Sequence, residues 1–121
     1  MDQPGGPEPI EPQPERGQDR GPTALTVAYA SALEAADAGL AAGLYAENAL
    51  LTSADERLWG RSGIVGWHED LLARGAVRAV PASSGNDTGR LDVDGPTGRH
   101  VVELAFDAAG RIGTARWLTV E

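Results

Sequence analysis

The sequence of 121 residues contains no cysteine and no lysine. The missing cysteine excludes disulfides, thiolate nucleophiles and cysteine-ligated metals. The missing lysine excludes Schiff-base chemistry through a side-chain amine. No run of about 18 apolar residues occurs either, so we expect no membrane-spanning helix.

Positive charge is scarce: the ten basic residues, all arginine, leave a formal net charge of −8 at pH 7. Nucleic-acid affinity comes largely from Lys and Arg that neutralise phosphates, so we expect no nucleic-acid partner. The N-terminus also lacks the apolar core of a signal peptide. These features predict a soluble, cytoplasmic protein with no membrane partner.

The first 22 residues contain six prolines and four glycines, and Ile10 is their one large apolar residue after Met1. Such a segment cannot bury enough apolar surface to offset its ordering entropy. We therefore predict a disordered, acidic tail over residues 1–22. Residues 23–121 then form one domain, which is the size of a single hydrophobic core.

Helical patterns precede strand patterns along this domain. Thr23 is a candidate N-cap for a first helix, whose apolar stripe follows a four-residue spacing. A short second helix is predicted over residues 40–46. A third helix is predicted from an N-cap at Ser62 to the stop at Gly75.

The remaining segments predict short strands joined by polar turns. Asp107 to Gly110 has the composition of a tight hairpin. The predicted strands cover residues 49–53, 76–82, 90–93, 99–106 and 111–120, with charged or polar loops at 54–57 and 83–87. Helices followed by a run of antiparallel strands predict an α+β domain, in which a curved sheet wraps around the first and third helices.

Three motifs follow one another along the sequence: YAENA at 45–49, GR at 60–61, and FD at 106–107 followed by GRI at 110–112. With these motifs in this order and spacing, the sequence resembles the nuclear transport factor 2-like superfamily, specifically its SnoaL-like branch. The resemblance covers about residues 24–121. It implies a cone-shaped, mostly antiparallel sheet around helices, with a cavity at one end. Members include ketosteroid isomerases, polyketide cyclases, dehydratases and non-catalytic binding domains, so the fold does not decide function.

The resemblance does not extend to the catalytic residues of the isomerases. Their carboxylate base matches Ser53, which is far too weak a base without an activator. Their acidic oxyanion donor matches Val102, and their donor tyrosine falls near Ala32, although Tyr29 lies one turn earlier. Isomerase chemistry of that kind is therefore not supported.

His68 is the candidate catalytic residue. The resemblance places it where isomerases keep a cavity-facing tyrosine, beside Trp67, and an imidazole can act as general acid or base near neutral pH. The alternative is a histidine on a helix face with a structural role. His68 and His100 lack a recognised ligand spacing with Asp55, so we predict neither a metal nor a cofactor.

Period-two alternation assigns one face of the strand 99–106 to the interior, because its apolar residues share that face with His100. The resemblance puts Trp117 on the same side of the sheet. The predicted ligand-binding residues are Tyr29, Tyr45, Leu51, Ser53, Trp59, Trp67, His100, Val102, Leu104 and Trp117.

Two functional hypotheses follow. The first is an acid–base enzyme of the cyclase, isomerase or dehydratase type, acting on an apolar polyketide-like or cyclic molecule. The second is a non-catalytic domain that binds a small apolar ligand or a protein partner; a cone filled by Trp67 and Trp117 at its centre would favour it. The resemblance also implies a homodimer through the outer face of the sheet, where Val101 and Ala105 lie.

Overall fold

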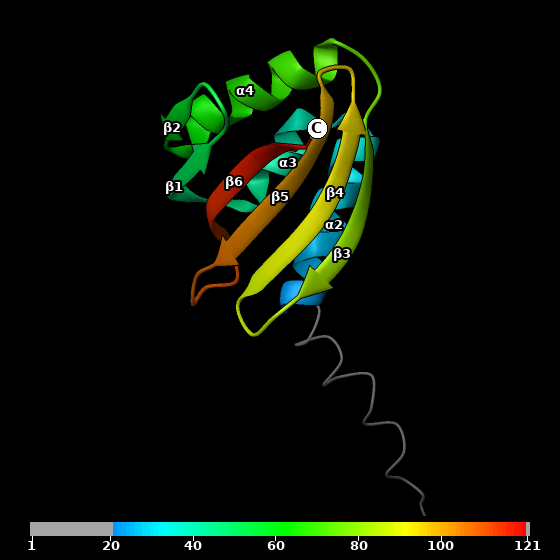
Figure 1. Cartoon of the computed structure of the whole chain (residues 1–121). Coiled ribbons are helices and arrows are strands. Elements are labelled where there is room, and N and C mark those ends of the chain that lie inside the picture. Colours follow the sequence, from blue (N-terminus) through cyan, green and yellow to red (C-terminus); the bar gives the residue numbers. More distant parts are fainter. Residues whose placement is uncertain (1–20, 121) are drawn as a thin grey trace, which may run out of the picture.

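A computed structural model describes residues 21–120 as three helices and a six-stranded sheet. Most of the predicted tail, residues 1–20, lies outside the described residues. The sheet has the strand order β2-β1-β6-β5-β4-β3. Strands β1 and β6 run parallel, and the other neighbouring pairs are antiparallel. Figure 1 shows the curved sheet in front of the helices, and the predicted α+β fold class is confirmed.

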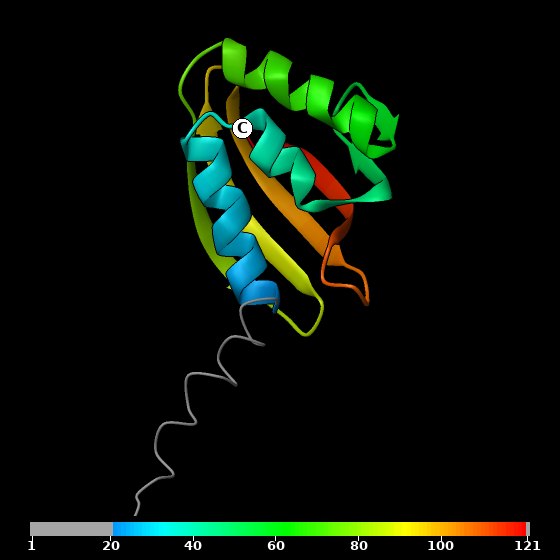
Figure 2. The same cartoon turned by 180° about the vertical axis from the view of Figure 1, so that it is seen from behind.

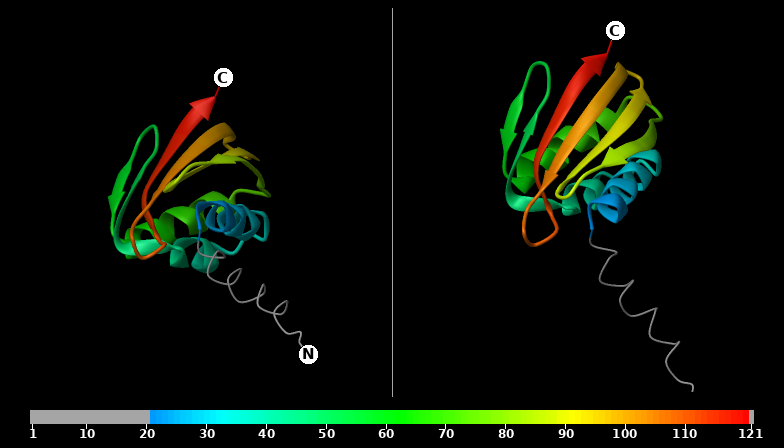
Figure 3. Two further views of the ribbon diagram at one scale, coloured as in Figure 1. Left: turned by 90° about the horizontal axis from the view of Figure 1, so that it is seen from below. Right: turned by 60° about the horizontal axis from the view of Figure 1, so that its bottom comes forward.

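All three helices cover the same face of the sheet. Helix α2 (Pro22–Glu34) packs against β3 (Arg78–Ser84) and β4 (Thr88–Gly95), as Figure 2 shows from behind. Helix α3 (Ala38–Gly43) packs against α4 (Arg61–Ala73). The sheet curls around these helices in both views of Figure 3 and leaves its outer face uncovered by any of them.

The hydrophobic core lies between the helices and the inner face of the sheet. Residues of β5 (Gly98–Phe106) alternate as predicted, with Val102, Leu104 and Phe106 buried. Gly89 of β4 lets α2 approach the sheet closely, because a Cβ there would overlap the Thr26 hydroxyl. Among the helices of residues 21–120, none has the length and apolar character needed to cross a membrane.

The first helix starts differently from the prediction. Gly21 is the N-cap of α2 and Pro22 occupies the first turn, so the assignment of Thr23 as N-cap was wrong. Proline suits this position because its fixed φ is helical and the N–H that it lacks would have no helical partner. The Thr23 hydroxyl instead lies 2.6 Å from the Ser84 hydroxyl, linking α2 to β3.

The change from helix to strand comes earlier than the sequence predicted. Helix α3 runs from Ala38 to Gly43, and β1 (Tyr45–Thr52) already begins at Tyr45, so the helix predicted over 40–46 was placed too late at both ends. The Arg61 guanidinium donates two hydrogen bonds to the Tyr45 carbonyl, at 3.1 and 2.8 Å. The β1–β6 register shifts between Tyr45 and Leu50. Arg61 thus hydrogen-bonds the Tyr45 carbonyl at the point where the pairing of β1 with β6 is irregular.

Other boundaries also differ from the prediction. Helix α4 is capped by Gly60 at φ 92° rather than by Ser62. Strand β2 (Arg57–Trp59), which begins at the last residue of the predicted charged loop, was missed because three residues carry too short a pattern. Strand β3 extends to Ser84, into the predicted loop 83–87, and β4 begins at Thr88, before the predicted start at residue 90, since backbone pairing needs no apolar side chain. The hairpin to β6 (Ile112–Val120) was predicted correctly, and Asp107 Oδ1 accepts the Arg111 N–H there at 2.9 Å.

Candidate functional site

Three polar aromatic side chains meet in the centre of the core. Tyr29 comes from α2, Tyr45 from the start of β1 and His68 from the middle of α4, and all three are fully buried. Their ring centroids lie 5.6–5.7 Å apart, in edge-to-face arrangements. We call these three residues the buried triad.

Hydrogen bonds join the buried triad in one line. The Tyr45 and Tyr29 hydroxyl oxygens are 2.7 Å apart, Tyr29 Oη is 2.6 Å from His68 Nε2, and His68 Nδ1 is 2.8 Å from the Ile64 carbonyl. A carbonyl only accepts, so Nδ1 carries the proton, and in neutral His68 Nε2 accepts from the Tyr29 hydroxyl. The Tyr29 oxygen then accepts from the Tyr45 hydroxyl. Every proton of the line has a partner.

Burial keeps the triad neutral. It lowers the pKa of His68 to about 4, although the hydrogen bond to Ile64 acts in the opposite direction. Burial also raises the pKa of both tyrosines well above the ordinary value. At neutral pH His68 is therefore uncharged, and both of its nitrogens are engaged within the protein. In this conformation it is a weak base with no free nitrogen.

Two tryptophans lie over the buried triad. Trp67 of α4 and Trp117 of β6 meet edge to face with ring centroids 4.8 Å apart. The Trp67 ring also lies 5.0 Å from His68. Trp67 is half-buried, whereas Trp117 is only 2% exposed. The two tryptophans thus fill the centre of the cone, the arrangement that was expected to favour a non-catalytic domain.

The Trp117 ring N–H is buried and has no hydrogen-bond partner among the described residues. Burial raises the pKa values of both tyrosines, and the Trp117 side chain opposes that effect at each of them.

A pocket of about 290 Å³ lies outside the tryptophans, between α4, the β1–β2 loop and the ends of β5 and β6. We call it the mouth pocket. Trp67, Trp117 and His100 form its aromatic wall, and the His100 ring lies 5.7 Å from Trp117. Partial burial lowers the pKa of His100. The other lining residues are Ser53, Ala54, Asp55, Glu56, Asp70, Leu71, Arg74, Thr97 and Thr119.

The predicted site residues fall into three groups. Those that line the mouth pocket are Ser53, Trp67, His100 and Trp117. Those buried beneath it are Tyr29, Tyr45, Leu51, His68, Val102 and Leu104. Trp59 lies apart from both, on the edge strand β2, where it pairs with Leu50 and is 69% exposed.

Sequence reasoning missed several polar residues of the mouth pocket. Asp70 and Arg74 lie three and seven residues after Trp67, which places them on the same helix face as Trp67. This spacing could have identified them as residues of the same site. Thr97 lies in a turn and no pattern marked it. Within residues 21–120, no group of three or more His, Asp or Glu side chains could hold a metal ion.

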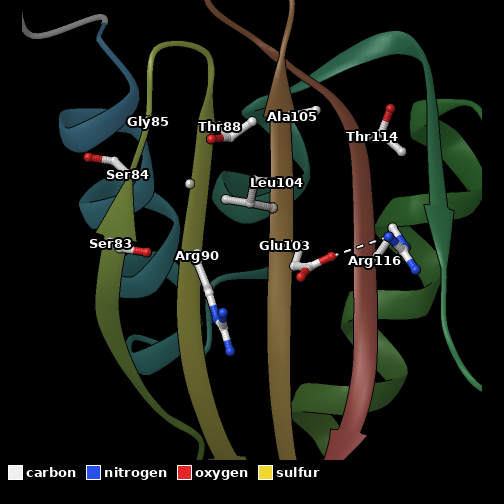
Figure 4. Close-up of a pocket in the computed structure, with 11 residues that line it drawn as sticks. Ser83, Ser84, Gly85, Thr88, Arg90, Glu103, Leu104, Ala105, Thr114 and Arg116 are labelled. Carbon is white, nitrogen blue, oxygen red and sulfur yellow. Dashed lines mark hydrogen bonds and ion pairs between the residues drawn. The ribbon is translucent and has the colours of Figure 1, made fainter.

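A second hollow, of about 400 Å³, lies on the outer face of the sheet. Figure 4 shows Arg90, Glu103 and Arg116 side by side across β4, β5 and β6, with the helices behind the sheet. Arg116 pairs with Glu103 at 3.3 Å. This hollow is open and lined by charged side chains.

The chain resembles known proteins in its fold and not in its sequence. No protein-family model and no curated protein sequence matches the chain. A SnoaL-like protein of unknown function from Burkholderia thailandensis is similar in structure, with a TM-score of 0.66 and 17% identity over 79% of this chain and 91% of that protein. The chain has the SnoaL-like fold.

A second solved structure supports this assignment. An NTF2-like protein of unknown function from Cytophaga hutchinsonii has a TM-score of 0.60 and 15% identity, over 78% of this chain and 85% of that protein. The resemblance to the nuclear transport factor 2-like superfamily, SnoaL-like branch, is therefore confirmed at the level of the fold. Because the SnoaL-like fold hosts many activities, the function must be argued from the mouth pocket and the triad.

Proposed function

We propose that this SnoaL-like domain binds a small, planar ring compound in the mouth pocket and does so without acid–base catalysis. The observation that carries the proposal is the contact between Trp67 and Trp117, which separates the pocket from His68. A flat ring against these indoles gains both apolar burial and favourable ring–ring contacts.

The size and charge of the mouth pocket limit which ligands it can bind. Its volume of about 290 Å³ lies just below the usual range for ligand pockets, roughly 300–1,000 Å³. This volume favours a molecule of one or two rings over a larger polyketide. Asp55, Glu56 and Asp70 outnumber Arg74 around the pocket, which disfavours an anionic ligand.

The test is an NMR titration with neutral one-ring and two-ring compounds, following the three indole N–H signals and the two histidines. We expect a binding compound to shift His100, Trp67 and Trp117 and to leave Trp59 unchanged. Trp67→Ala should weaken binding at least about tenfold, because it removes one aromatic wall. The matched control is Trp59→Ala, which should bind as the unchanged protein does.

The same titration tests the catalytic hypothesis for His68. We expect His68 to remain neutral from pH 5.5 to 8, with or without a ligand, because it is buried and both of its nitrogens are bonded. If His68 titrates near neutral pH and a ligand shifts that titration, the acid–base enzyme is correct. If no compound shifts any mouth-pocket signal, ligand binding there is wrong.

A homodimer through the outer face of the sheet is a second proposal. Its support is the uncovered face itself, where Leu118 and Val120 are exposed beside the row formed by Arg90, Glu103 and Arg116. Sedimentation equilibrium of the full chain is the direct test. A dimer that Leu118→Arg dissociates would support this interface, whereas a monomer at high concentration would contradict it.

A further inference from the structure

The charged residues around the mouth pocket are mostly acidic, and they come from two separate elements. Asp55 and Glu56 lie in the loop between β1 and β2, whereas Asp70 lies on α4. Among the described lining residues, Arg74 is the one arginine. Partial burial lowers the pKa of His100, so its imidazole is neutral at pH 7. The lining therefore has three carboxylates against one guanidinium, which is a net charge of −2.

The three pocket carboxylates are not engaged in ion pairs within the described part of the chain. The salt bridge found among residues 21–120 joins Arg116 to Glu103 on the outer face of the sheet. Asp70 and Arg74 lie one turn apart on α4, yet they form no such pair. All three carboxylates are also exposed to solvent. A positive group in the pocket can therefore be attracted to them without first breaking an internal ion pair.

The aromatic wall of the mouth pocket favours the same sign of charge. The face of an aromatic ring is electronegative, and tryptophan attracts cations more strongly than the other aromatic side chains. Trp67 and Trp117 both line the pocket. Asp70 lies three residues after Trp67 on the same helix face, so an indole and a carboxylate border the same part of the pocket. The wall and the charges are separate features, and both select a positive ligand.

We infer that the mouth pocket recognises a cationic ring compound, namely one that carries an amine protonated at neutral pH. This inference rests on the proposed function, because the ring of the ligand packs on the tryptophan wall as described there. Its ammonium group lies toward the carboxylates at the exposed side of the pocket, where water still solvates part of it. The ligand therefore gains electrostatic attraction without the full cost of burying a charge.

Three probes share the indane ring system and differ in the charge of one substituent. At pH 7, 2-aminoindane is a cation, 2-indanol is neutral and indane-2-carboxylate is an anion. In NMR titrations of the full chain, we expect 2-aminoindane to bind at least about fivefold more tightly than 2-indanol. Indane-2-carboxylate should bind more weakly than 2-indanol. Addition of about 0.5 M NaCl should reduce the preference for the amine, because salt screens exposed charges.

A neutralising double variant tests whether the pocket carboxylates cause this preference. Asp55→Asn with Asp70→Asn should reduce the preference for 2-aminoindane to about twofold or less and should leave the affinity for 2-indanol nearly unchanged. Both side chains are exposed, so we expect the fold to tolerate these changes. The matched control is Asp92→Asn with Asp94→Asn, which removes the same charge from the exposed side of β4 and should keep the preference. Arg74→Gln should have the opposite effect and strengthen binding of the amine by about twofold.

Contrary results separate this inference from the proposed function. If 2-indanol or indane-2-carboxylate binds as tightly as 2-aminoindane, cation recognition is wrong while ring binding stands. If the control variant on β4 weakens the preference as much as the pocket variant does, the attraction belongs to the charge of the whole chain and the inference is again wrong. If no probe shifts the signals of Trp67, Trp117 or His100, the mouth pocket binds no ring compound and both proposals fail.

Discussion

The two faces of the sheet differ sharply although they alternate along the same strands. On β5, Val102 and Leu104 point into the core, whereas Arg99 and Glu103 point away from it. Across β3 to β6 the outer face carries four arginines and three carboxylates, arranged in cross-strand rows. The core against the inner face has neutral polar groups: the hydroxyls of Thr26, Tyr29 and Tyr45, the His68 imidazole and the Trp117 indole N–H. All of these except the Trp117 N–H are hydrogen-bonded within the described residues, whereas the charged groups stay where water solvates them.

A matched pair of leucines should show the largest contrast between the faces. Leu104 is 2% exposed on the inner face, and Leu118 is 38% exposed on the outer face of the neighbouring strand. We expect Leu104→Ala to lower the free energy of unfolding by about 2–5 kcal/mol through lost burial and a cavity. Leu118→Ala should cost less than about 1 kcal/mol. Urea denaturation measures both, and similar costs would show that the outer face is covered in solution.

The pH dependence of stability should separate His68 from His100. Folded His68 has a pKa of about 4, and the unfolded group has its ordinary value of 6.5, so the unfolded state binds more protons between these pH values. Stability should therefore fall as pH drops from about 6.5 to about 4, by roughly 3 kcal/mol.

Denaturation at pH 7 and pH 4 checks this difference with two variants. His68→Phe leaves the Tyr29 hydroxyl without its acceptor and should cost about 1–3 kcal/mol at pH 7. The variant has no titrating group at position 68, so acid does not destabilise it through that group. Its deficit in unfolding free energy relative to the unchanged protein should therefore shrink or reverse at pH 4. His100→Gln is the control and should keep most of the acid destabilisation. A His68→Phe variant with the same pH profile as the unchanged protein would contradict a buried neutral His68.

Two glycines should respond in opposite directions to the same substitution. Gly89→Ala puts a methyl group against Thr26 and Phe106 and should destabilise the protein by about 1–3 kcal/mol. Gly66→Ala lies in α4 with nothing within 4 Å of its new Cβ and should stabilise by about 0.5–1 kcal/mol. Thermal unfolding gives the sign of each change. A harmless Gly89→Ala would mean that α2 does not pack closely on β4.

The smallest effect is expected for the ion pair on the outer face. Arg116 and Glu103 lie 3.3 Å apart, but both side chains are largely exposed. Glu103→Gln should therefore change the unfolding free energy by less than about 1 kcal/mol. The same measurement in 1 M NaCl should reduce the difference further. A larger cost would indicate that this pair is shielded from water, as in a dimer interface.

Much of the fold could be predicted from local patterns, and the misses have physical causes. The alternation of Val102, Leu104 and Phe106 identified the inner face of β5, because period two is a property of the strand itself. The start of β1 at Tyr45 was missed because it is defined by pairing with Ile112 of β6, which lies far away in the sequence. For the candidate site, the sequence predicted His68 as catalytic and Tyr29 as ligand-binding, but it did not predict the hydrogen bond that joins them, because the two residues lie on different helices 39 positions apart.

The sequence alone determined the absence of cysteine and lysine chemistry, the acidic charge, the α+β class and the resemblance to SnoaL-like proteins. These properties depend on composition and on local order, which are written in the chain. The tertiary structure decided that the tryptophans meet, that His68 is enclosed and that the Trp117 N–H has no partner within residues 21–120. Those properties depend on distances between side chains of α2, α4, β1 and β6, which lie far apart in the sequence, and only packing determines such distances.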